Sequence, residues 1–366
     1  MLEKAGTRYT LVDKSDSAQP AIGGGVFLTP QVMRVYDQLG LLPELDEIGT
    51  RGAQLKYFTQ DGKEVACVVP EHFENFGYHA YFFARIELME VLLRHIPKEK
   101  VLWSKKVVGT SQDEKSVSVF FSDDSTLEGH ILVGADGAYS AVRQSMYHNM
   151  KDQGIPIPEE DMGKLHFNEY CVLGMTEDIS EKFPIVSSKD QYLSIVLGSK
   201  ENPYNLAYAP TKGGRLCWRI AGKLIDNQVV DEASFRFSDW GSESIQDIVA
   251  EIEKVPIAIG GTVGNLLENT KSISRVMLED KWFNTWYQGR TVLAGDSCHK
   301  TLPAAGQGAI QAILDAVVLA NLMHELPSTD VKDLEHMFAT YFDLRGEVTR
   351  QVVETSKKLG KLASGN

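Results

Sequence analysis

The chain has 366 residues, and its 37 Lys and Arg against 50 Asp and Glu give a formal net charge of −13 at pH 7. This length indicates two or three structural lobes. The acidic balance argues against nucleic-acid binding and against attachment to anionic membranes. The four cysteines are widely spaced, which indicates reduced thiols rather than a disulfide framework or a zinc site.

No run of about 18 uncharged apolar residues occurs, and the charged start of the chain lacks a signal-peptide core. We therefore expect a cytoplasmic protein without a membrane span. The nine histidines show no ligand spacing such as H-x-x-x-H, so we expect no bound metal. The oligomeric state stays open.

The N-terminal part of the chain alternates strand-like and helix-like patterns. Residues 2–5 resemble the end of a helix that Gly6 closes, although so short a helix would not fold by itself. Helices are predicted over residues 30–39 and 85–96. Asp61-Gly62 predicts a hairpin turn in a region of strands and turns. The predicted strands are residues 9–12, 101–103, 117–121 and 131–133.

The middle of the chain is strand-like, and the C-terminal part returns to strands and helices. We expect the middle strands to form an antiparallel sheet that covers a pocket. A terminal helix over residues 331–362 is predicted to break or bend near Gly346. This order of elements indicates an α/β protein with a second lobe inserted. The other predicted elements are strands 170–175, 192–197, 216–220 and 291–293, and helices 245–253 and 309–323.

The first candidate site is the run from Gly134 to Arg143, which contains Asp136, Gly137 and Ser140. A buried strand would turn at Gly-Asp-Gly and enter a helix capped by Ser140. Small residues let the backbone approach a ligand closely, and a helix N-terminus favours anionic groups. These residues alone leave a binding site and a purely structural corner equally open.

The second candidate site runs from Gly295 to Ala309, directly after the strand over 291–293. The strand delivers Asp296 to its carboxyl end, where open α/β sheets bind ligands. The run Gly306-Gln307-Gly308 opens a long helix whose first turn has free N–H groups suited to an anionic or electron-rich ligand. Glycines that only give clearance for helix packing are the alternative, but the Gly-Gln-Gly opening favours binding.

Together the two sites resemble the class A flavin-dependent monooxygenases, FAD enzymes of the aromatic-hydroxylase type. The family's G-A-D-G motif, followed by Ser and Arg, is matched at Gly134 to Arg143, and its G-D-(A/S)-x-H-x-x-x-P-x-x-G-Q-G motif at Gly295 to Gly308. Asp13 stands where the family has an acidic residue for the adenosine ribose. Arg85 resembles the family arginine near the FAD diphosphate. The arrangement is most similar to the fungal branch that oxidises terpenoid or polyketide-derived intermediates.

The resemblance implies a Rossmann-like FAD-binding domain with a three-layer, mixed or parallel sheet, an inserted antiparallel-sheet substrate domain and C-terminal helices. It implies that NADPH or NADH reduces FAD and that O2 then gives a flavin C4a-hydroperoxide. That species would hydroxylate or epoxidise an aromatic or terpenoid/polyketide-type small molecule. The implied cofactor-binding residues are Asp13, Lys14, Arg85, Asp136, Gly137, Arg143, Gly295, Asp296, Pro303, Ala305, Gly306, Gln307, Gly308 and Ala309.

The resemblance also bears on the roles of single residues and on the division of the chain into domains. His299 is interpreted as a structural, flavin-proximal residue rather than a catalytic base, and the catalytic residues stay unknown. Tyr192, Tyr208 and Trp218 are candidates for pocket walls, although core packing is the favoured interpretation for each. The implied segments are 1–50, 81–165 and 281–325 for the FAD-binding domain (the first of them truncated), 51–80 and 166–280 for the substrate lobe, and 326–366 for the C-terminal helices.

The chain departs from the family in two places. No G-x-G-x-x-G loop precedes Asp13, and Ile310 stands where the family commonly has Asn. Without that loop the diphosphate loses a helix N-terminus and close main-chain contacts, so we expect weak FAD binding by this chain. A truncated, cofactor-poor relative without catalysis is therefore one alternative. A flavin halogenase or reductase on the same fold is another.

Overall fold

The chain divides into two compact units, each built from segments that are far apart in the sequence. The first unit comprises Met1–Ala18, Leu93–His166 and Glu279–Lys358. The second comprises Gln19–Leu92, Phe167–Leu278 and Leu359–Asn366. The computed structural model describes all residues except 18–23, 53, 70, 164, 166, 188–190, 201–202, 224–248, 251 and 364–366.

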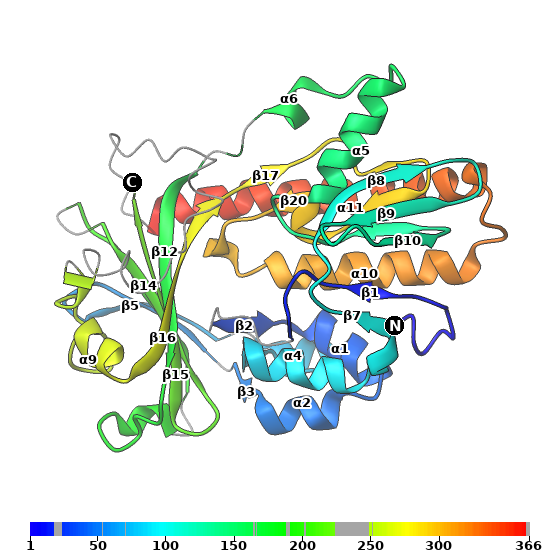
Figure 1. Cartoon of the computed structure of the whole chain (residues 1–366). Helices are drawn as coiled ribbons and strands as arrows, with labels where there is room; N and C mark the ends of the chain where they lie inside the picture. Colours follow the sequence, from blue (N-terminus) through cyan, green and yellow to red (C-terminus); the bar gives the residue numbers. More distant parts are fainter. Residues whose placement is uncertain are drawn as a thin grey trace. The chain divides into compact units, whose positions relative to one another are not determined.

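In the first unit, short parallel strand pairs bring distant segments together (Figure 1). Strand β1 pairs in parallel with β7, and β11 pairs in parallel with β19, whose other edge pairs with β18. Strands β8, β9 and β10 form a separate antiparallel sheet. The strands of this unit are β1 Leu11–Val12, β7 Val101–Leu102, β8 Val107–Gln112, β9 Val117–Phe121, β10 Thr126–Gly129, β11 Leu132–Gly134, β17 Lys281–Trp282, β18 Tyr287–Gln288, β19 Thr291–Leu293 and β20 His299–Lys300.

The α-helices and the core of the first unit fix the carboxyl end of β19. Leu293 of β19 and Phe338 and Tyr341 of α11 are fully buried in one cluster with Trp286. Burial of each such side chain stabilises the fold by about 1.5–3 kcal/mol. The Tyr341 hydroxyl also donates to the Leu293 carbonyl over 3.2 Å. The α-helices of this unit are α5 Ala141–Asp152, α6 Glu159–Met162, α10 Gly308–Glu325 and most of α11 Val331–Ala363.

The second unit is organised by a seven-stranded sheet in the order β16-β12-β15-β14-β13-β4-β5 (Figure 1). Strands β12 and β15, β15 and β14, β14 and β13, and β4 and β5 pair antiparallel, whereas β13 and β4 pair in parallel. A smaller antiparallel sheet has the order β2-β6-β3. The strands of this unit are β2 Gly25–Leu28, β3 Thr50–Arg51, β4 Leu55–Phe58, β5 Glu64–Val68, β6 Tyr81–Ala84, β12 Phe167–Thr176, β13 Leu193–Val196, β14 Asn205–Thr211, β15 Arg215–Lys223 and β16 Thr270–Glu279.

The two faces of the large sheet differ in burial, because successive residues of a strand point to opposite faces. The registers join one row of residues that lies entirely in the hydrophobic core: Val172, Ile220, Leu206, Val196 and Phe58. They join the next row on the other face, which we call the open row: Leu173, Arg219, Ala207, Ile195 and Tyr57. All members of the open row except Ala207 are partly exposed.

The α-helices of the second unit lie mainly in its N-terminal segment. They are α1 Pro30–Gln38, α2 Leu42–Ile48, α3 His72–Phe76, α4 Arg85–Arg94 and α9 Val263–Glu268. Pro30 stands at the first helical position of α1, and Gly40, at φ 76°, follows its end, so the predicted start and closing glycine are confirmed. Helix α4 begins at Arg85 as predicted.

Most predicted elements are present, with small differences in their ends. The α/β class with an inserted, mainly antiparallel sheet is confirmed, and Gly62 forms the β4–β5 turn at φ 83°. The predictions omitted β8 and β10 of the three-stranded antiparallel sheet, and β14 and β16 of the seven-stranded sheet. Tyr208 and Trp218 lie in the core of the second unit and Tyr192 packs against it, which confirms core packing, although Tyr192 and Tyr208 also line a small cavity beside this core.

Three predicted features of helices have different outcomes in the structure. Helix α11 runs through Gly346 without interruption, so a break there is wrong, whereas the alternative of a bend stays a prediction. Its long amphipathic pattern and buried neighbours outweigh the low helix propensity of one glycine. The predicted helix 245–253 falls largely on residues outside those described. At the N-terminus, bonds from Gly6 N–H to Glu3 and from Thr7 N–H to Leu2 form a Schellman cap, as expected for the end of a helix.

Within the described residues, no helix is both long enough and apolar enough to cross a membrane.

Candidate functional site

The first site is the turn between β11 and α5 in the first unit. A Cβ on Gly134 would lie 2.8 Å from Val142 Cγ1 and 2.9 Å from Leu293 Cδ2, so only glycine fits there. Ser140 caps α5, since its hydroxyl accepts from Arg143 N–H over 2.9 Å. Asp136 supports the same turn, because its carboxylate accepts from the Ser140 hydroxyl and, over 3.1 Å, from Val142 N–H. The predicted cap is confirmed.

The second site begins where β19 ends. Gly295 has φ 63°, which favours glycine, and its N–H is buried. The Ser297 hydroxyl lies 2.6 Å from the Gly134 carbonyl, which links this turn directly to the first site. Asp296 is partly exposed and pairs with Lys300 over 2.7 Å. A carboxylate in this position can still accept hydrogen bonds from ligand hydroxyls at its free lone pairs.

Arg143 joins the two turns. It is only 5% exposed, and its Nη1 and Nη2 donate to the carbonyls of Ser297 over 2.5 Å and Ala138 over 2.6 Å. Its guanidinium also lies 3.9 Å from the ring centre of Phe283. Burial lowers the pKa of Arg143, but the group stays charged at neutral pH. Both guanidinium ends are thus used within the protein, so the geometry gives Arg143 the task of aligning the turns.

The start of α10 presents main-chain N–H groups to an open surface. Gly306 has φ 63°, and a Cβ there would meet no atom within 4 Å. Gly306 N–H donates to the Pro303 carbonyl over 3.0 Å, and the first bond of helical spacing runs from Gln311 N–H to the Gln307 carbonyl over 2.9 Å. The N–H groups at 307–310, between these two bonds, are those that the start of a helix leaves without a partner in the helix. Pro303, Gly306 and Ala309 are exposed. This loop can receive an anionic or electron-rich ligand without moving a side chain.

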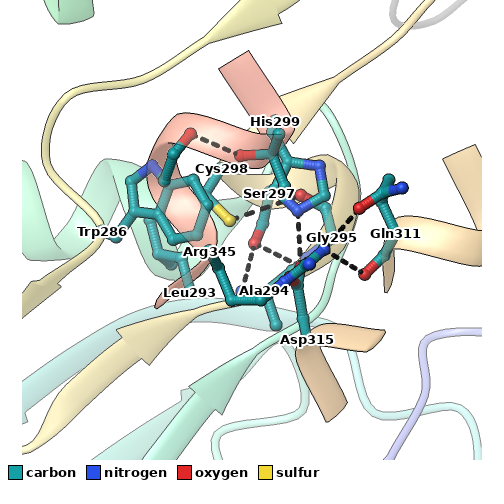
Figure 2. A network of polar contacts seen from close by, with 12 residues as sticks. Trp286, Leu293, Ala294, Gly295, Ser297, Cys298, His299, Gln311, Asp315 and Arg345 are labelled. Carbon is teal, nitrogen blue, oxygen red and sulfur yellow. Dashed lines mark hydrogen bonds and ion pairs between the residues drawn. The ribbon is translucent and has the colours of Figure 1, made fainter. Parts of the chain in front are cut away.

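A buried polar network lies behind this loop, with Asp315 of α10 at its centre (Figure 2). The Asp315 carboxylate accepts from Gly295 N–H over 2.9 Å, from His299 Nε2 over 2.5 Å and from Arg345 Nε over 2.8 Å. Burial raises the pKa of Asp315, but the bonds and charges of His299 and Arg345 outweigh burial and hold it below the ordinary value. Asp315 is therefore ionised.

The network continues to the start of α10. Arg345 Nη2 donates to the Gln311 side-chain oxygen over 2.6 Å and to its carbonyl over 3.2 Å. The Gln311 amide in turn donates to the Gln307 side-chain oxygen over 3.1 Å. Sequence reasoning missed Gln311, Asp315 and Arg345. The spacing of Gln307, Gln311 and Asp315, four residues apart on an apolar helix, was the available signal, but Arg345 gave none.

Three potential metal-ligating groups also meet here. Ligand atoms of Cys298, His299 and Asp315 lie within 4.8 Å of one another. Burial raises the pKa of the Cys298 thiol, which disfavours the thiolate that a metal requires. The Asp315 carboxylate is already bonded to three donors. The arrangement is thus explained by hydrogen bonding, and the sequence-based expectation of no metal stays a prediction.

The remaining predicted residues lie outside this cluster. Asp13 is exposed at the end of β1, where its carboxylate accepts from Ser15 N–H over 2.8 Å, and Lys14 beside it is exposed. Arg85 is exposed and belongs to the second unit. Ala305 lies in the single turn Pro303–Ala305 just before Gly306. The structure thus brings together the predicted residues of the two turns, and their role in cofactor binding stays a prediction.

The sequence profile of a family described as "FAD binding domain" matches residues 1–196 and 258–356. The chain belongs to this FAD-binding family. An FAD-dependent monooxygenase, ptmM of Penicillium ochrochloron, is 28% identical over 374 residues, which cover 98% of this chain and 84% of the relative. Another, ausM of Emericella nidulans, is 30% identical over 337 residues, covering 90% and 67% respectively.

Solved structures show the same fold. Klebsiella pneumoniae HpxO complexed with FAD and uric acid superimposes with a TM-score of 0.76 at 19% identity, covering 100% of this chain and 85% of that one. CtdE in complex with FAD and a substrate gives a TM-score of 0.77 at 15% identity, covering 99% and 85%. The predicted resemblance, the fold class and the expectation of an oxidoreductase of the FAD-dependent monooxygenase family are confirmed.

The residues of the first unit fit FAD. The open φ 63° position at Gly306, the free N–H groups of the α10 N-terminus and the exposed Ala309 form a cradle without side chains. Such a cradle suits a flat ring or an anionic group. Asp296 offers carboxylate oxygens for hydroxyl groups. The positive end of α10, an 18-residue helix, faces this cradle.

Proposed function

We propose that this protein is a monooxygenase that uses FAD, NADPH or NADH, and O2 to hydroxylate or epoxidise an aromatic or terpenoid/polyketide-type small molecule. The observation that carries the proposal is the junction of the two turns by Arg143, beside the open start of α10. The similarity to fungal FAD-dependent monooxygenases over nearly the whole chain supports it. Bound FAD would supply the electron transfer to O2 that amino-acid side chains cannot perform.

The residues of the first unit would bind and orient the cofactor. The α10 N-terminus would stabilise negative charge that develops on an electron-rich ring. Asp296 would accept hydrogen bonds from ligand hydroxyls, and Asp13 from the ribose. Arg143 would keep the two turns in register through its bonds to Ser297 and Ala138. No side chain here is assigned as an acid or base, since the proposed oxygen transfer asks mainly for positioning and a dry site.

The open row of the large sheet would contact the substrate in the second unit. Leu173, Ala207, Ile195 and Tyr57 make this row largely apolar. Arg219 stands in its middle, and its Nη1 donates to the side-chain oxygen of Asn205 over 3.1 Å. This combination suits an apolar skeleton that carries one oxygen substituent, because the guanidinium has further N–H donors.

Cofactor binding is tested first with the purified chain. Because no G-x-G-x-x-G loop precedes Asp13, we expect weak binding: the chain should change the fluorescence of added FAD with a measurable Kd, but should lose much of the cofactor during gel filtration. Ala309→Glu should bind FAD about five- to ten-fold more weakly than Ala309→Gln, a control of the same size, because the carboxylate repels an anionic ligand at the helix N-terminus. Glu should also stabilise α10 slightly relative to Gln, which separates a binding defect from misfolding.

Activity is tested by oxidation of NADPH and NADH in the presence of O2. A panel of aromatic and terpenoid compounds should contain members that stimulate this oxidation and gain one oxygen atom by mass spectrometry. Arg219→Met should raise the KM of such a substrate several-fold, whereas the kcat should change less. A colourless protein that binds no added FAD would favour the cofactor-poor alternative over the monooxygenase.

A further inference from the structure

The buried network joins Gly295 and Gln307, two residues of the second site that are twelve positions apart in the chain. At one end, the Asp315 carboxylate accepts from the N–H of Gly295, the second residue after β19. At the other end, the Gln311 side-chain amide donates to the side-chain oxygen of Gln307, the residue immediately before α10. Arg345 connects these ends, since its Nε bonds to Asp315 and its Nη2 to Gln311. One side chain of α11 thus bonds both to Asp315, which binds Gly295, and to Gln311 (Figure 2).

Arg345 supplies a permanent positive charge to the buried network. The Asp315 carboxylate only accepts hydrogen bonds, so the proton of His299 must lie on Nε2, which faces it. His299 Nδ1 is buried and has no hydrogen-bond partner among the described residues. Arg345 forms an ion pair with the ionised Asp315, and its Nε lies 2.8 Å from the carboxylate. Both side chains are almost completely buried, so water cannot replace either partner.

We propose that Arg345 is a positioning residue that sets the geometry of the FAD cradle through Asp315 and Gln311. It is 6% exposed, and among the described residues its hydrogen bonds go to Asp315 and Gln311, so it would act without touching the cofactor. The planar guanidinium is required because it bonds in two directions at once, whereas a lysine ammonium is a single point charge. The inference rests on the proposed binding of FAD at this loop.

A purely structural role makes a different prediction. If Arg345 only attached α11 to α10, its loss would lower the stability of the unit and leave the cradle unchanged in the folded protein. If Arg345 positions the cradle, its loss would loosen residues 303–311 and weaken FAD binding even where the protein remains folded. Hydrogen exchange in the absence of FAD and FAD affinity therefore separate the two roles.

The experiment compares Arg345→Lys with Arg350→Lys in the full chain. Arg350 lies on the same helix but is exposed and pairs with Glu347, so it is a matched control. Gln311→Leu is the second test variant, because it breaks the link to Gln307 and leaves no unpaired buried charge. We expect about ten-fold weaker FAD binding for Arg345→Lys and Gln311→Leu by flavin fluorescence, against less than about two-fold for Arg350→Lys.

Hydrogen–deuterium exchange of the FAD-free proteins provides the independent readout. Both test variants should exchange faster over residues 303–311, with unchanged exchange in the β8–β9–β10 sheet. Unchanged exchange over 303–311 in both variants would overturn the inference, whether or not the protein binds FAD. Faster exchange with wild-type FAD affinity would also overturn it. A wild-type chain that binds no FAD would refute the proposed function, while the exchange result would still decide the positioning of the loop.

Discussion

The strongest test of the described site is the replacement of Arg143 by methionine. Two bonds from the charged guanidinium to the carbonyls of Ser297 and Ala138 would be lost. Each is worth about 1.5–3 kcal/mol, because a buried carbonyl would keep no partner. Relief from burying the guanidinium and the apolar fill of methionine offset part of this loss. We therefore expect a net decrease of about 2–4 kcal/mol in the free energy of unfolding.

Urea unfolding followed by tryptophan fluorescence measures this decrease, and Arg350→Met is the exposed control. Because Arg143 aligns the two turns, the variant that still folds should also bind FAD at least about ten-fold more weakly. Arg143→Lys should fall between the variant and the wild type, since an ammonium reaches one carbonyl but not both. A methionine variant with wild-type stability and FAD affinity would refute the alignment of the turns by Arg143.

Three further predictions follow from the same geometry. Gly295→Ala should lower the free energy of unfolding in urea by about 2–4 kcal/mol, because alanine is strained at φ 63° and its Cβ would lie 3.0 Å from that of Ala312. Gly137→Ala, at φ 83° but with no atom within 4 Å of the added Cβ, should lower it less. Equal decreases would contradict the packing argument. The native pKa of Asp315 lies below its ordinary value, so the ionised carboxylate stabilises the fold above about pH 4 and loses that effect as the pH falls further. The difference in unfolding free energy between wild type and Asp315→Asn should therefore be constant from pH 5 to about 7 and shrink in acid. A difference that grows in acid would reverse the direction of the assigned pKa shift. A thiol reagent at pH 8 should label the exposed Cys67 quickly and the three buried cysteines slowly. Burial raises the pKa of Cys171 to about 11 and that of Cys217 to about 12, and it also raises the pKa of Cys298. Rapid labelling of the Cys67→Ser variant would show that the buried thiols are accessible.

The sequence by itself determined the local features of this protein. Backbone conformation depends on a residue and its immediate neighbours. It accounts for the glycines at positions 295 and 306, for the helix cap at Ser140 and for the start of α1 at Pro30. The spacing of the two motifs was also local, and it led to the correct family. Residue patterns over short windows therefore sufficed for most helices and strands and for both turns.

Only the tertiary structure decided which distant residues support those turns. Arg345 lies on a helix whose pattern gives no sign of a polar partner, and its contacts with Asp315 and Gln311 depend on how α11 packs on α10. The same is true of the open row, since alternation along one strand cannot tell which of its faces packs on the core. Burial and pairing between segments far apart in the chain are set by the whole packed unit, and a short stretch of sequence does not contain that information.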